Sequence, residues 1–100
     1  MHKVIVMPAA ERDLEGLTAF VRRDSPVQAD RIEDRRFAAM ASLAEFPLRC
    51  GVAVESARWG YSVRCLPVHR YRVLYTVRDS TVFVLRIVHG SMNSPVEPDA

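Results

Sequence analysis

The first part of the chain joins a short apolar run to two stretches of helical periodicity. Residues 3–7 are mostly β-branched and predict a strand. Over residues 8–23 apolar side chains recur with the spacing of an amphipathic helix. Ser25 is a good helix cap and Pro26 a good first helical residue, so a second helix is expected over residues 26–45. Because the connection is very short, the two helices should form an antiparallel hairpin.

After Pro47 the hydrophobic pattern changes from the period of a helix to that of a strand. Residues 52–55 are interpreted as a short strand, and apolar side chains alternate with polar ones over 61–66 and again over 69–77. Residues 81–88 are apolar almost throughout, so this last strand should lie in the middle of a sheet with both faces covered.

These elements predict a single small domain. Pro67 should end one strand, and residues 78–80 should form a tight hairpin turn. The resulting class is α+β: an N-terminal strand and an antiparallel helical hairpin packed on a small antiparallel sheet, in the order β-α-α-β-β-β. Residues 1–90 are expected to form the domain, and residues 91–100 a C-terminal tail that is mobile or ordered only on a partner.

The composition is that of a globular protein and adds one asymmetry of charge. Hydrophobic residues make up 49% and charged residues 26%, which argues against disorder. The apolar runs are too short for a spanning helix or a signal peptide, so a cytoplasmic, membrane-free protein is expected. Residues 47–90 carry seven arginines and two acids, a net 7 − 2 = +5. This favours an acidic partner, nucleic acid or protein, although a solvated face of sheet arginines would give the same count.

The cysteines and histidines give no sign of a metal or redox site. Cys50 and Cys65 have no CxxC spacing, and the histidines are His2, His69 and His89. We therefore expect no metal and no cofactor.

Five segments together resemble the RelE/ParE superfamily of toxins from type II toxin–antitoxin systems. They are AERDLEGL at 10–17, DSPVQA at 24–29, LAEFP at 43–47, YRVLYTV at 71–77 and VLRIVHG at 84–90. No single segment is specific, but their order and gaps match the superfamily over roughly residues 4–93. The resemblance implies a helical hairpin on a small antiparallel sheet, which agrees with the fold expected from the periodicity.

The superfamily contains two chemistries, and the first is cleavage of mRNA on the ribosome by RelE-like members. For such a metal-independent endoribonuclease the resemblance implies Arg72 and His89 as catalytic residues, with Arg64 and Glu55 as a further cation and base. However, Gly90 stands where related nucleases carry a tyrosine, and the lysine pair and C-terminal arginine and tyrosine of RelE are missing. The acid–base set is therefore incomplete.

The second chemistry belongs to ParE-like members, which poison DNA gyrase and do not cut RNA. HGSMN at 89–93 is close to the ending of some ParE-like toxins, and Gly60-Tyr61 followed by Arg64-Cys65 is close to their G-Y-R-R-C strand. We favour this function, with no catalytic residue, over a RelE-like nuclease acting on ribosome and mRNA and over a non-toxic nucleic-acid-binding module. The candidate target-binding residues are Arg64, Arg70, Arg72, Arg86, His89, Met92 and Asn93.

The resemblance also implies a hetero-oligomer with a cognate, ParD-like antitoxin. Its partly disordered arm would wrap the toxin, with apolar residues in the groove beside the helical hairpin and acids on the basic half. The candidate antitoxin-binding residues are Leu17, Phe20, Val21, Arg58, Trp59 and Tyr61. Purely structural roles remain open for Arg72 and His89, and core packing for Trp59 and Tyr61.

Overall fold

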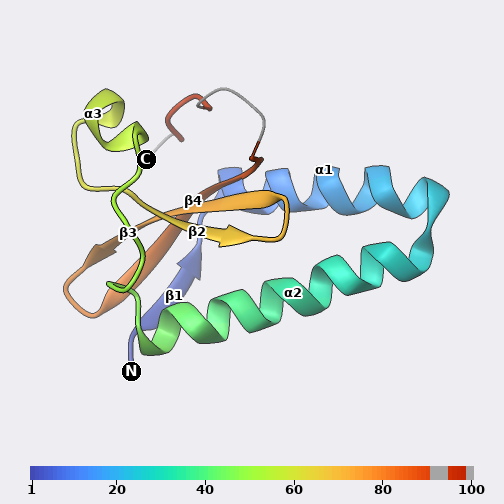
Figure 1. Ribbon diagram of the computed structural model, residues 1–100, viewed down its shortest axis with the longest axis horizontal. Helices are drawn as coiled ribbons and strands as arrows, with labels where there is room; N and C mark the ends of the chain where they lie inside the picture. The colour runs from blue at the N-terminus through green and yellow to red at the C-terminus, as the bar shows by residue number, and fades with distance from the viewer. Residues whose placement is uncertain (91–94, 99–100) are drawn as a thin grey trace.

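The computed structural model describes residues 1–90 and 95–98 (Figure 1). In this part of the chain the elements are β1 (Lys3–Val6), α1 (Pro8–Asp24), α2 (Pro26–Glu45), α3 (Glu55–Trp59), β2 (Arg64–Val68), β3 (Tyr71–Arg78) and β4 (Thr81–His89). The α+β class is confirmed, as is the order of strand, helical hairpin and three strands. No helix in the described ranges is long and apolar enough to cross a membrane.

The helical hairpin forms where the proline and cap signals place it. Pro26 begins α2, and the Ser25 hydroxyl accepts a hydrogen bond from the Gln28 amide at 3.2 Å, which satisfies one unpaired donor of the first turn. An ion pair between Arg36 and Glu11 joins the two helices near the sheet. The hairpin reaches well beyond the sheet, so the connection between its helices lies far from the strands (Figure 1).

The sheet has the strand order β1-β4-β3-β2. β4 lies between β1 and β3, as its nearly continuous apolar sequence predicts. β2, β3 and β4 pair antiparallel, whereas β1 pairs parallel with β4, with Val4 opposite Val82 and Val6 opposite Val84. The sheet is therefore mixed and not antiparallel throughout. No local signal sets the direction of this pair, because most of the chain separates β1 from β4.

The prediction of a strand at residues 52–55 is wrong. Val52 makes only an isolated bridge with Arg64, and the chain then turns into α3. The Ser56 hydroxyl ties this short helix to the following segment: it accepts from the Val63 amide at 2.8 Å and donates to the Val63 carbonyl at 2.9 Å. Gly60 ends α3 with φ of 82°, a left-handed conformation that glycine adopts without strain.

The neighbouring strand is also displaced from its expected position. β2 begins at Arg64, three residues later than the alternation over 61–66 implies, and it includes Pro67. β2 is an edge strand of the sheet, so the missing N–H of Pro67 can face away from β3 without loss of a ladder hydrogen bond. A proline at this edge also disfavours pairing with another strand.

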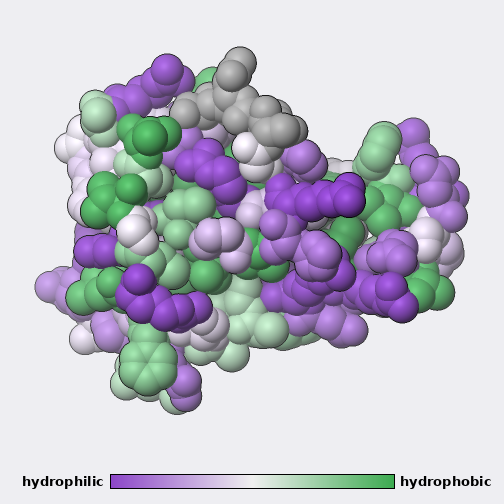
Figure 2. Space-filling model, in the orientation of Figure 1, coloured by the Kyte–Doolittle hydropathy of each residue, from purple (hydrophilic) through white to green (hydrophobic). Residues whose placement is uncertain are grey.

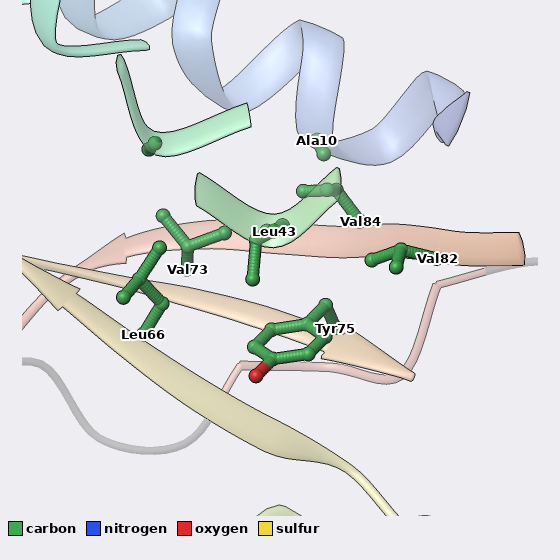
Figure 3. Packing of buried hydrophobic residues seen from close by; sticks show 8 residues of the cluster. Ala10, Leu43, Leu66, Val73, Tyr75, Val82 and Val84 are labelled. Atoms are coloured by element: carbon green, nitrogen blue, oxygen red, sulfur yellow. The ribbon is translucent and has the colours of Figure 1, made fainter. Parts of the chain in front are cut away.

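The main core lies between the helical hairpin and one face of the sheet (Figure 3). Leu43 of α2 points toward the sheet, and Tyr75 at the centre of β3 is fully buried. The Tyr75 hydroxyl donates to the Pro47 carbonyl, and burial raises the pKa of Tyr75 far above its ordinary value. The buried members of this core are Ala10, Ala39, Leu43, Leu66, Val73, Tyr75, Val82 and Val84.

A second core covers the opposite face of the same strands. It joins α3 and its flanking segments to β3 and β4, through Ala53, Trp59, Val63, Leu74 and Leu85. The sheet is therefore buried on both faces. On the side of the molecule drawn in Figure 2, hydrophilic side chains gather over the hairpin, whereas apolar ones are scattered mainly over the sheet half.

Leu43→Ala should lower the free energy of unfolding by about 2–5 kcal/mol, because it opens a cavity between α2 and the sheet. Leu48→Ala is the control: Leu48 is 61% exposed, and its loss should cost about 0.5 kcal/mol or less. Urea denaturation of the two variants measures both values. Equal destabilisation would contradict the placement of Leu43 in the core.

Candidate functional site

One end of the sheet brings together the start of β3 and the end of β4; we call Arg70, Tyr71, His89 and Gly90 the sheet terminus. Tyr71 lies opposite His89, and their rings meet edge to face with centroids 5.5 Å apart. The Gly90 amide donates to the Arg70 carbonyl at 2.7 Å. A Cβ atom at position 90 would lie only 3.2 Å from that carbonyl oxygen, so glycine permits the close approach.

An apolar groove runs from the hairpin to this end of the sheet. Leu17, Ile32 and Met40 line it on the helix side, and Tyr71 and Ile87 on the sheet side. A cavity of about 230 Å³ at the sheet terminus shares Leu17, Tyr71 and Ile87 with the groove. The groove and the sheet terminus therefore form one continuous surface.

Two arginines of α2, Arg35 and Arg36, also line this groove. Neither was predicted from the sequence as a binding residue. The sequence shows only that they lie in a predicted helix, and this does not reveal that a groove opens beside them. Arg36 is paired with Glu11 and Glu33, whereas Arg35 forms no ion pair with a carboxylate of the described residues. Arg35 therefore adds positive charge to an otherwise apolar surface, which suits a partner segment that carries acids beside its apolar residues.

The guanidinium group of Arg72 forms a buried ion pair. Its two terminal nitrogens donate to the two carboxylate oxygens of Glu55 at 3.1 and 2.8 Å. The Glu55 side chain is completely buried, and that of Arg72 is 22% exposed. The hydrogen bond to Glu55 raises the pKa of Arg72 further and outweighs the opposing effect of burial. This geometry fixes α3 on the sheet and leaves Glu55 inaccessible to a substrate.

Arg86 is held in the same way by α1. Its Nε and Nη2 atoms donate to the two carboxylate oxygens of Asp13 at 2.8 and 2.9 Å, and the Ile87 amide donates to the same carboxylate at 2.9 Å. The hydrogen bond that Arg86 donates to Asp13 raises the pKa of Arg86. β4 carries one extra residue, Leu85, in a bulge opposite β3, an irregularity that can re-aim a neighbouring side chain.

The remaining target-binding candidates differ in accessibility. Arg64 donates to the carbonyls of Cys50 and Leu48 and is thus held against the loop after α2. Arg70 is exposed at the sheet terminus, where His89 also lies. Met92 and Asn93 lie outside the described residues.

The antitoxin-binding candidates fall into two separate places. Leu17, Phe20 and Val21 follow one another along α1, where Leu17 lines the groove and Phe20 is 68% exposed. Arg58, Trp59 and Tyr61 lie instead on or just after α3, on the other side of the sheet. Trp59 is a core residue at 7% exposure, and its indole N–H has no acceptor among the described residues. The exposed member of this second group is Arg58.

Within residues 1–90 and 95–98, no cluster of three or more His, Cys, Asp or Glu side chains could hold a metal ion. Cys50 and Cys65 are both free and partly buried.

Comparison with known proteins gives two findings. A family model described as "ParE toxin of type II toxin-antitoxin system, parDE" matches residues 4–94. Among solved structures, a chain titled "Chromosomal ParDE TA system from P. aeruginosa" superposes with a TM-score of 0.69 at 20% identity, covering 89% of this chain and 96% of that one. At this identity the likeness concerns the fold. No curated protein matches the sequence.

Arg72→Ala should lower the free energy of unfolding by about 3–5 kcal/mol, because it leaves the buried Glu55 carboxylate without its partner. The control is Arg22→Ala, which removes an ion pair with Asp30 whose side chains are 50% and 72% exposed. That loss should cost about 1 kcal/mol or less. Urea denaturation compares the two variants; a small effect of Arg72→Ala would mean that the pair does not hold α3 in place.

Proposed function

The chain belongs to the ParE family of toxins from type II toxin–antitoxin systems, and we propose that it inhibits bacterial growth by poisoning DNA gyrase. One observation supports this most strongly: the bidentate pair between Arg72 and the fully buried Glu55. Arg72 and Glu55 are two of the four catalytic candidates of a ribonuclease, and here they bind each other. An activity based on binding is therefore favoured over catalysis. Such a toxin would act in the cytoplasm.

The competing function is a RelE-like endoribonuclease that cuts mRNA on the ribosome. Its chemistry needs a base within hydrogen-bond reach of the 2′-hydroxyl and an acid near the leaving oxygen. Glu55 is too buried to reach a substrate, and Arg64 donates to backbone carbonyls of its own chain. His89 alone lies at the open end of the sheet, against Tyr71. This arrangement lacks an accessible pair of acid and base.

We place the gyrase contact at the sheet terminus. Arg70 is exposed there, in contrast to Arg72 and Arg86, whose guanidinium groups bind carboxylates of the same chain. Arg70 also lies beside the point where the chain leaves the sheet toward Met92 and Asn93, because its carbonyl accepts from the Gly90 amide. An accessible cation at this end of the sheet suits contact with acidic side chains or with DNA phosphates bound by the enzyme.

We further propose that a ParD-type antitoxin binds the apolar groove. An amphipathic arm would place apolar side chains against Leu17 and Ile32 and direct an acid toward Arg35. Since Tyr71 belongs both to this groove and to the sheet terminus, an arm that fills the groove would cover the gyrase contact as well. Neutralisation then follows from occlusion and needs no change in the toxin's fold.

Arg70→Glu should reduce gyrase-dependent accumulation of linear plasmid at least about tenfold, because it reverses the accessible charge of the contact. Arg23→Glu, the same change at the exposed end of α1 away from the sheet, should leave the accumulation unchanged. The assay contains purified toxin, gyrase, ATP and supercoiled plasmid. Full activity of Arg70→Glu would exclude the sheet terminus as the contact, and no linear DNA with the unmodified chain would refute gyrase as the target.

Phe20→Asp should weaken the complex with the cognate antitoxin at least about tenfold, since Phe20 lies one turn beyond Leu17 on the same helix and an exposed aromatic is a typical binding anchor. Phe37→Asp is a matched control: Phe37 is 69% exposed, against 68% for Phe20, but it belongs to α2 instead of α1. Calorimetric titration with the purified antitoxin measures both affinities. Equal losses for both variants would argue against binding along α1.

A further inference from the structure

Residues 95–98, which we call the C-terminal strap, cross the sheet face that lies opposite the hairpin. Arg86, besides binding Asp13, donates from Nη1 to the Val96 carbonyl at 2.8 Å. Glu97 and Pro98 then line a hollow on that face. The strap therefore returns along the chain's own sheet instead of leaving the domain.

The hollow beneath the strap is largely unfilled. Its volume is about 380 Å³, and Met7, Phe83 and Leu85 supply apolar side chains to it. Val96 does not fill this space, because its side chain is 80% exposed. The strap thus borders an apolar hollow large enough for a bulky side chain that the strap itself does not supply.

The rim of the hollow carries a cation. The Arg78 guanidinium lies 6.0 Å from the centre of the Tyr61 ring, and no carboxylate of the described residues forms an ion pair with it. Glu97 lines the same hollow. The pKa of Tyr61 is raised first by burial and then by the charge of Glu97, while Arg78 lowers it, so both charges act on this ring. The strap therefore brings a carboxylate to a site that favours one.

We propose that this hollow is a docking site for an extended peptide of a partner that carries a bulky apolar side chain next to a carboxylate, and that the C-terminal strap is its displaceable internal occupant. Arg86 takes a backbone carbonyl of the peptide, Arg78 attracts the carboxylate, and Met7, Phe83 and Leu85 receive the apolar side chain. The strap satisfies the first two requirements and leaves the third open. A peptide that meets all three gains the burial that the strap lacks.

Displacement is feasible because few contacts hold the strap. Among the described residues its one hydrogen bond to the domain is that of Val96 with Arg86, and both Val96 and Glu97 are exposed. Covalent attachment raises the local concentration of the strap to the millimolar range, which offsets its weak contacts. The main obstacle to an incoming peptide is therefore the high local concentration of the attached strap, and the strength of the strap's contacts matters less.

The first experiment measures the order of the strap in the full chain, by heteronuclear ¹⁵N NOE at the amides of Val96 and Glu97. The unmodified chain should give values typical of ordered backbone, and Glu97→Arg should lower them through repulsion by Arg78. The charge swap Arg78→Glu with Glu97→Arg should restore them. Glu45→Arg, a reversal of an exposed acid on α2, is the control and should change nothing. Low NOE values in the unmodified chain, or no response to Glu97→Arg, would refute the proposal that the strap is held on the sheet.

The second experiment measures binding of a fluorescein-labelled peptide with the sequence of residues 91–100, by fluorescence anisotropy. The full chain carrying Glu97→Arg should bind it at least about tenfold more tightly than the unmodified chain, whose site is occupied. The same peptide with Pro98→Leu should bind that variant roughly three- to tenfold more tightly still, because leucine can enter the hollow. No binding, or no gain from leucine, would refute the docking site. Neither experiment uses gyrase, so the outcome is independent of the proposed target.

Discussion

The two central strands of this protein must be covered on both faces, and most of the structure follows from that requirement. In β3, Val73 and Tyr75 point toward the helical hairpin, whereas Leu74 between them belongs to the opposite core. A second cover is therefore needed, and α3 with its flanking segments provides it. α3 brings the Glu55 carboxylate into a dry environment, where the charge must be balanced. Arg72 supplies that balance, so its primary role is structural.

The same logic explains why three arginines of the basic half are held by groups of their own chain. Glu55 and Asp13 bind Arg72 and Arg86, and backbone carbonyls hold a third arginine, Arg64. Arg70 remains accessible at the sheet terminus. On the proposed function, a fold shared by toxins of different chemistry serves binding because its potential catalytic groups are used for internal ion pairs. The groove shares this end of the sheet, so binding of the target and of the antitoxin would be mutually exclusive.

Local signals in the sequence predicted the hairpin, because Ser25 and Pro26 act through the backbone next to them. They failed where tertiary context decides. Residues 52–55 were interpreted as a strand because of Val52 and Val54, but the chain there enters α3; Pro67 was interpreted as a strand end although it lies within an edge strand. The site was harder to predict. The family resemblance identified Arg86, but its partner Asp13 lies 73 residues away, and charge counts do not reveal such pairing.

The most direct test of a binding toxin without a catalytic centre uses one preparation of the unmodified chain in two assays. One contains gyrase, ATP and supercoiled plasmid, and the other contains ribosomes programmed with mRNA. The ion pairs of Arg72 and Arg86 predict linear, gyrase-bound DNA in the first and intact mRNA in the second. Cut mRNA with unaffected gyrase would contradict this account and return Arg72 and His89 to a catalytic role.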